Sequence, residues 1–146
     1  MERFEKQVLA RVLPLFSYGP AAAAFMAGLA ILGGWHLDDD QLKSLFRQGG
    51  VEINPLVALE LLLGGVGLAL LNSGRRSLWR KMGAACGALM AFVALGKILG
   101  YLLFWYRSID TWFFYLKLGS NRMDPNTAVA FALLGLAMAA LDLRRR

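Results

Sequence analysis

Few residues of this 146-residue chain are of types that catalyse reactions or bind metals and cofactors, and their number and positions limit these roles. Glu60 and Lys97 are ionisable residues within long apolar segments, Cys86 is the lone cysteine and His36 is the lone histidine. One cysteine and one histidine exclude an internal disulfide framework, a thiolate-rich zinc or iron–sulfur site and a bis-histidine haem. We therefore expect no catalytic residue, no metal site and no resident cofactor.

Glu60 and Lys97 are predicted to form an ion pair. Glu60 lies five residues inside its apolar segment, roughly 8 Å at a rise of 1.5 Å per residue, and Lys97 lies at a similar depth in another segment. Charged side chains at membrane depth are costly and usually pair inside the helix bundle. Two alternatives stay open: a ligand-binding or protonation role for both residues, and a Lys97 side chain that reaches toward the headgroups.

The composition indicates a membrane protein. Apolar residues make up 58% of the chain and charged residues 18%, whereas soluble domains carry about 45–50% and about 25%. Four segments approach the roughly 20 apolar residues that cross a bilayer, at residues 12–37, 55–74, 82–106 and 125–143. We predict one all-α integral membrane domain over residues 1–146 with four transmembrane helices. Residues 1–12 would form an interfacial helix or a cytoplasmic extension of the first span.

The basic residues predict the orientation. Ten Lys and Arg residues lie in the amino-terminal piece, in the loop around residues 73–82 and in the carboxy-terminal tail, and five lie in the two longer loops on the other side. The positive-inside rule therefore places both termini in the cytoplasm, in the inner membrane of a bacterium. Because the net charge of +6 is split among three segments, it favours anionic lipid headgroups as partners and argues against nucleic acid.

The chain contains an internal repeat. Shifting the sequence by 70 residues places Asn54 and Pro55 over Asp124 and Pro125, each an N-cap residue followed by proline at the first helical position. Two spans per copy return the chain to the same side of the membrane. We therefore predict two parallel helical hairpins, about residues 13–74 and 82–143, related by a pseudo-twofold axis along the membrane normal.

Each of the two outer loops is predicted to contain a short interfacial helix. Acidic residues precede an apolar set in both loops, at Asp38 to Asp40 and at Asp110. The aromatic residues of this face either anchor it in the headgroups or close over a lipophilic ligand such as a lipid or quinone. The residues predicted to form the ligand site are Trp105, Trp112, Phe114, Tyr115, Asn54, Asp124 and Asn126.

Most of the chain, and most clearly the stretch from Met123 to Ala137, resembles the amino-terminal multi-span input region of bacterial sensor histidine kinases and diguanylate cyclases. In that family a Met-x-Pro-Asn-Thr-Ala start precedes a span rich in Phe and Leu, and here the residues are Met-Asp-Pro-Asn-Thr-Ala. The resemblance implies an input module ahead of cytoplasmic output domains, which would carry any kinase or cyclase activity. No such motif follows Arg146, so the chain is either an excised input domain or a free-standing relative.

Two functions are compatible with these features. We favour a membrane-embedded sensory module that detects a lipophilic or membrane-associated cue in its outer half and relays it to cytoplasmic output. The alternative is a small proton-coupled transporter of lipophilic cations, which an intramembrane Glu60 could support. Gly83 and Gly87, and likewise Gly96 and Gly100, mark a close-packing seam on the third span, and we favour packing within the chain over packing across a homodimer.

Overall fold

The computed structural model describes residues 2–45, 51–73, 77–103 and 121–143, and within these ranges it describes side chains from residue 18 to residue 141. Helices fill most of these ranges: α1 (Glu2–Leu37), α2 (Asp40–Lys43), α3 (Pro55–Asn72), α4 (Ser77–Leu102) and α6 (Pro125–Leu143). None of the described residues lies in a β-strand. The predicted all-α class is therefore confirmed.

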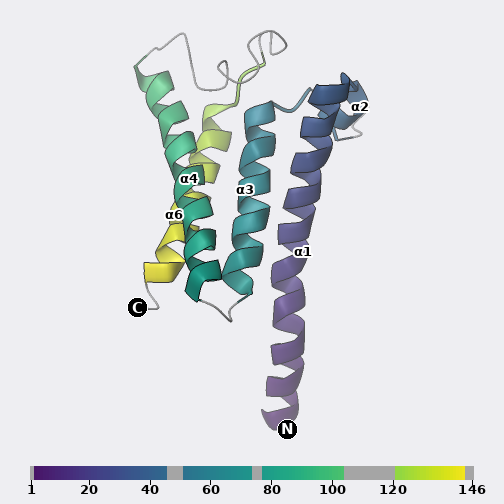
Figure 1. Ribbon diagram of the computed structural model, residues 1–146, viewed down its shortest axis with the longest axis vertical. Coiled ribbons are helices and arrows are strands. Elements are labelled where there is room, and N and C mark those ends of the chain that lie inside the picture. Colours follow the sequence, from purple (N-terminus) through teal and green to yellow (C-terminus); the bar gives the residue numbers. More distant parts are fainter. Residues whose placement is uncertain (1, 46–50, 74–76, 104–120, 144–146) are drawn as a thin grey trace.

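The four long helices alternate in direction, with α1, α3 and α4 side by side and α6 behind α4 in the view of Figure 1. α1 packs along α3, α3 along α4 and α4 along α6, while α3 and α6 make only a small contact. α3 and α6 begin at the same end of the molecule, which we call the Asn54 end. α1 is one continuous helix through Pro14, and its first turns project beyond the other helices at the opposite end (Figure 1).

Three of the described helices are long and apolar enough to cross a membrane: Tyr18–Leu37 within α1, Pro55–Asn72 and Ser77–Leu102. Their outward faces expose large apolar side chains, including Phe92 at 73% and Met26 at 62% exposure. Extended apolar surface of this kind is typical of contact with lipid. The chain is therefore a membrane protein. The described apolar part of the fourth predicted span, Pro125–Leu141, is shorter.

Glycine allows the closest approach within each of two helix pairs, α1 with α3 and α4 with α6. A β-carbon at Gly65 on α3 would lie 2.6 Å from the carbonyl oxygen of Ala21 on α1. A β-carbon at Gly135 on α6 would lie 2.5 Å from the carbonyl oxygen of Gly87 on α4. Any larger side chain at either position would push the two backbones apart.

A hydrogen bond closes each pair at the Asn54 end. The Trp35 indole N–H donates to the Ile53 carbonyl oxygen at 2.8 Å, and the Tyr101 hydroxyl donates to the Met123 carbonyl oxygen. Trp35 and Tyr101 are 66 residues apart in the sequence, whereas Ile53 and Met123 are 70 apart. The glycine contacts follow the same two offsets, from Ala21 to Gly87 and from Gly65 to Gly135.

These offsets explain why the first and third predicted spans look only loosely alike in the sequence. A single shift of 70 residues aligns α3 with α6 but misaligns α1 with α4 by four residues. The four additional residues lie in the connection that precedes α6. The contacts of α1 with α3 thus have counterparts in the contacts of α4 with α6.

The glycines of the third predicted span pack inside the chain. A β-carbon at Gly83 would lie 2.8 Å from the Gly67 carbonyl oxygen on α3, and one at Gly87 would lie 2.8 Å from the Gly135 carbonyl oxygen on α6. Both α4 glycines are buried. The prediction of internal packing at Gly83 and Gly87 is confirmed, and α4 is the helix that joins the two pairs.

Candidate ligand-binding site between the two helix pairs

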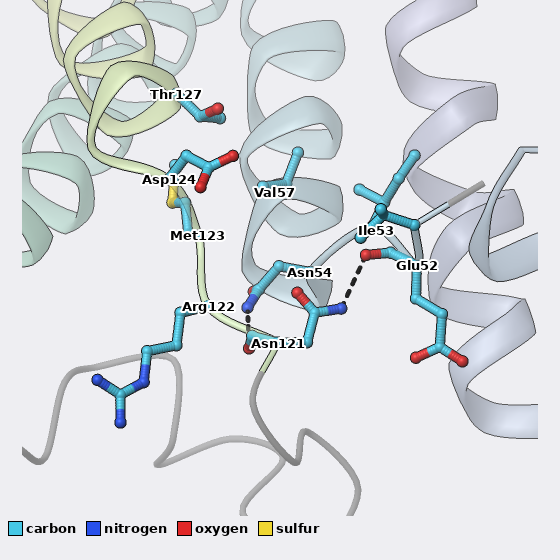
Figure 2. A pocket seen from close by; sticks show the side chains of 10 residues that line it. Glu52, Ile53, Asn54, Val57, Asn121, Arg122, Met123, Asp124 and Thr127 are labelled. Carbon is cyan, nitrogen blue, oxygen red and sulfur yellow. Dashed lines mark hydrogen bonds between the residues drawn. The ribbon is translucent and has the colours of Figure 1, made fainter.

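A pocket of about 550 Å³ lies at the Asn54 end, where the residues before α3 meet the residues before α6 (Figure 2). Its ten lining residues form five couples separated by 70 positions in the sequence. The couples are Val51 and Asn121, Glu52 and Arg122, Ile53 and Met123, Asn54 and Asp124, and Val57 and Thr127. Each helix pair thus contributes the same five positions, and a ligand in this pocket would contact both pairs.

Two asparagines hold the two sides of the pocket together. The Asn54 side-chain oxygen accepts a hydrogen bond from the Leu56 N–H at 2.8 Å, and its side-chain nitrogen donates to the Asn121 carbonyl oxygen at 3.0 Å. The Asn121 side chain donates in turn to the Glu52 carbonyl oxygen at 2.8 Å (Figure 2). Asn54 is only 3% exposed, and a buried amide requires such partners. The predicted N-cap role of Asn54 is confirmed.

The second predicted cap differs from the first. Pro125 begins α6 as expected, and the Ala128 N–H donates to the Asp124 backbone carbonyl at 3.0 Å. The structure shows no hydrogen bond from a helix N–H to the Asp124 carboxylate within the described residues. The exposed carboxylate is instead directed toward Val57 across the pocket (Figure 2). It is therefore available to a cationic or hydroxylic group of a ligand.

The two other charged residues of the pocket, Glu52 and Arg122, differ in the direction of their side chains. The Glu52 carboxylate lies 3.6 Å from the Lys43 ammonium nitrogen. The Arg122 side chain is exposed and points to the opposite side of the pocket in Figure 2. A ligand beside Asp124 would meet an exposed carboxylate, which disfavours a purely anionic head group.

Lys43 fixes the connection between α1 and α3. Its ammonium group donates to Asp38 at 2.8 Å and to Asp40 at 3.0 Å, and it lies 5.2 Å from the centre of the Trp35 ring. Hydrogen bonds to Asp38 and then Asp40 hold the pKa of Lys43 above its usual range. The predicted short helix of this loop is present as α2, with Asp39 as its N-cap.

Glu60 and Lys97, the two residues of the predicted ion pair, are not joined by a hydrogen bond. Glu60 and Lys97 are both 1% exposed, but neither Glu60 carboxylate oxygen has a hydrogen-bond partner among the described residues. The Lys97 ammonium instead lies 4.9 Å from the centre of the Tyr101 ring, one turn nearer the Asn54 end. This direction is the one expected for a lysine that reaches toward the headgroups.

The remaining predicted site residues are only partly accounted for. Trp105, Trp112, Phe114 and Tyr115 lie outside the described residues, as does the second outer loop. Asn126 is exposed on the first turn of α6 but does not line the pocket. Within the described part of the chain, no three His, Cys, Asp or Glu residues form a group that could hold a metal ion.

Glu52, Asn121, Arg122 and Thr127 line the pocket but were not predicted from the sequence. The 70-residue repeat places Glu52 over Arg122 and Val51 over Asn121, which differ in residue type, so the alignment alone gave no indication of a shared site. Searches among protein families, curated proteins and solved structures return no match to this chain.

Proposed function

We propose that this chain is a membrane-embedded sensory module of a bacterial signalling protein, with the pocket at the Asn54 end as its ligand site. The observation that carries the proposal is the composition of that pocket, whose lining residues come in equal number from both helix pairs. A ligand bound there contacts both pairs, so its affinity depends on how they are arranged. Differential affinity for two arrangements is what a sensor requires.

The proposed membrane topology has four spans and two hairpin repeats. α6 has 19 residues, about 28 Å at 1.5 Å per residue, which is close to the hydrocarbon thickness of a bilayer. The matching contacts of the two helix pairs support the hairpin repeat. The distribution of Lys and Arg favours cytoplasmic termini in the bacterial inner membrane. The Asn54 end would then face outward.

The proposed ligand is an amphiphile with a polar head group, such as a membrane lipid or a quinone. The pocket offers the Asp124 carboxylate and the Thr127 hydroxyl to a head group. It lies at the end of three apolar helices, so the hydrocarbon part of an amphiphile would stay in the membrane beside them. These properties support a cue that arrives through the lipid phase rather than a free metabolite.

Transmission to the cytoplasmic side would follow the helices that leave the pocket. α3 and α6 start beside it and end at Asn72 and Leu143, at the opposite end of the molecule (Figure 1). Both are packed through glycine contacts against α4, which limits independent bending. A change in the spacing of α3 and α6 at the pocket would therefore reach their far ends, where a cytoplasmic output domain would be attached.

The topology is tested with single cysteines in a Cys86→Ala background. Asp39→Cys lies beside the Asn54 end and Ser77→Cys begins α4 at the other end. A membrane-impermeant maleimide added to intact cells should label residue 39 and not residue 77. Labelling in the reverse pattern would place the pocket on the cytoplasmic side and would remove the proposed outward-facing site.

The ligand site is tested by mass spectrometry of lipids and quinones that remain with the protein after gentle purification. Thr127→Ala and Asn126→Ala form a matched pair, because the residues are neighbours on α6 and only Thr127 lines the pocket. We expect Thr127→Ala and Asp124→Asn to lower the amount of one bound species, and Asn126→Ala to leave it unchanged. A bound fraction that is the same in all variants would refute the pocket as the ligand site.

A further inference from the structure

Glu60 is a fully buried carboxyl group at the interface between the two helix pairs. It is 1% exposed, and neither oxygen has a hydrogen-bond partner in the described part of the chain. Glu60 lies on the same face of α3 as Leu56 and Gly64. Leu56 is one helical turn before Glu60, and Gly64 is one helical turn after it. Leu56 packs against Met123 and Gly64 against Met90. This face of α3 is therefore directed at the other helix pair.

The packing register places Glu60 opposite Ala94 on α4. Gly64 faces Met90, and Gly83 on α4 faces Leu71 on α3. In these two antiparallel helices, moving seven residues along α3 from Gly64 to Leu71 corresponds to moving seven residues back along α4 from Met90 to Gly83. Ala94 is completely buried. Lys97 is then about one helical turn, roughly 5 Å, nearer the Asn54 end, and its ammonium group is directed further that way, over Tyr101.

No other ionisable side chain of the described helices faces Glu60 at its own level. On α4 the nearest in the other direction is Cys86, which lies beside Gly67. The described side chains of α6 include no ionisable group, Asp124 lies just before its first turn, and the described side chains of α1 contribute Tyr18 and His36 near the two ends of its span. An ionised carboxylate at this position would lack both water and a hydrogen-bond donor, a state that proteins avoid by keeping the group neutral.

We propose that Glu60 is a proton-binding site that controls the packing of the two helix pairs. The carboxyl group is protonated while α3 and α4 are packed together. Ionisation breaks its O–H bond and passes the proton to water, leaving the electron pair on the carboxylate. The charged group then requires hydration, and α3 separates from α4 near Gly64 and Gly67. The site does not depend on the ligand pocket, from which Glu60 is absent.

Infrared spectroscopy of the full chain in lipid vesicles tests the protonation state. At neutral pH we expect a carbonyl stretching band of a protonated carboxylic acid in the wild type. Glu60→Gln should lose this band, whereas Glu52→Gln, the same change at a carboxylate that is near Lys43, should keep it. Absence of the band from the wild type, or its persistence in Glu60→Gln, would refute the proton site.

The wild type alone provides a second measurement if Glu60→Gln proves unstable, because Cys86 is the natural reporter of this interface. Its β-carbon lies 3.0 Å from the position of a β-carbon at Gly67. The rate at which N-ethylmaleimide modifies Cys86 should rise with pH over the range in which the carboxylic acid band disappears. In Glu60→Gln only the ionisation of the thiol itself should remain. Identical pH profiles in the two proteins, or modification that does not follow the loss of the band, would refute the coupling to helix packing.

Discussion

Replacing Gly135 by alanine should weaken the contact between α4 and α6, because the added β-carbon would overlap backbone atoms of α4. The added β-carbon would lie 2.5 Å from the Gly87 carbonyl oxygen and 2.6 Å from the Ala91 backbone nitrogen. Both are backbone atoms, so relief requires the two helices to move apart by several tenths of an ångström. Overpacking of this kind costs about 1–3 kcal/mol, while alanine gains about 0.8–1.0 kcal/mol over glycine in helix propensity.

Gly33→Ala is the matched control, because a β-carbon at Gly33 on α1 meets no atom within 4 Å. Both variants gain the same helix propensity, so the difference between them isolates the cost of the contact, about 1–3 kcal/mol. Gly65→Ala should show a similar cost, since Gly65 makes the corresponding contact with Ala21. The assay is reversible unfolding in bicelles by titration with a denaturing detergent. Equal stability of Gly135→Ala and Gly33→Ala would refute the close approach of α4 and α6.

Three further predictions follow from contacts at the Asn54 end. Tyr101→Phe should lower the free energy of unfolding by about 1 kcal/mol, because a half-buried hydrogen bond to a backbone carbonyl is lost, and an unchanged unfolding midpoint would contradict this. Asn54→Ser should keep the side-chain cap on the Leu56 N–H and lose the hydrogen bond to the Asn121 carbonyl oxygen, whereas Asn54→Ala loses both. Amide hydrogen exchange at the start of α3 should therefore be faster in the alanine variant than in the serine variant. The neighbours of Lys43 raise its pKa in the folded state, so the contribution of Lys43 to the free energy of unfolding should persist at neutral pH and decline only above the ordinary pKa of lysine. If the stability of Lys43→Gln follows the same alkaline pH profile as that of the wild type, this prediction is wrong.

The all-α class and three of the predicted spans followed from the sequence because they depend on local properties. Runs of apolar residues predict membrane helices by length alone, and α3, α4 and most of the apolar part of α1 lie where those runs lie. The starts of α3 and α6 were predicted to the residue, since Asn54–Pro55 and Asp124–Pro125 act within one helical turn.

The candidate site was predictable only in part. Asn54 and Asp124 were identified from their capping pattern, and both line the pocket. Asn121, Glu52, Arg122 and Thr127 were missed because their roles arise from contact between segments about 70 residues apart, as in the bond from Asn121 to the Glu52 carbonyl. Nothing in the local sequence around Asn121 distinguishes it from an ordinary loop asparagine.

The sequence by itself determined which segments are helical and where the helices that begin with proline start, because backbone conformation and apolar character are properties of short stretches. Only the tertiary structure decided which helices are neighbours and how α1 corresponds to α4. Depth along a helix can be counted from the sequence, whereas the register between two helices is set by the side chains that interlock, here Gly64 with Met90 and Gly67 with Gly83.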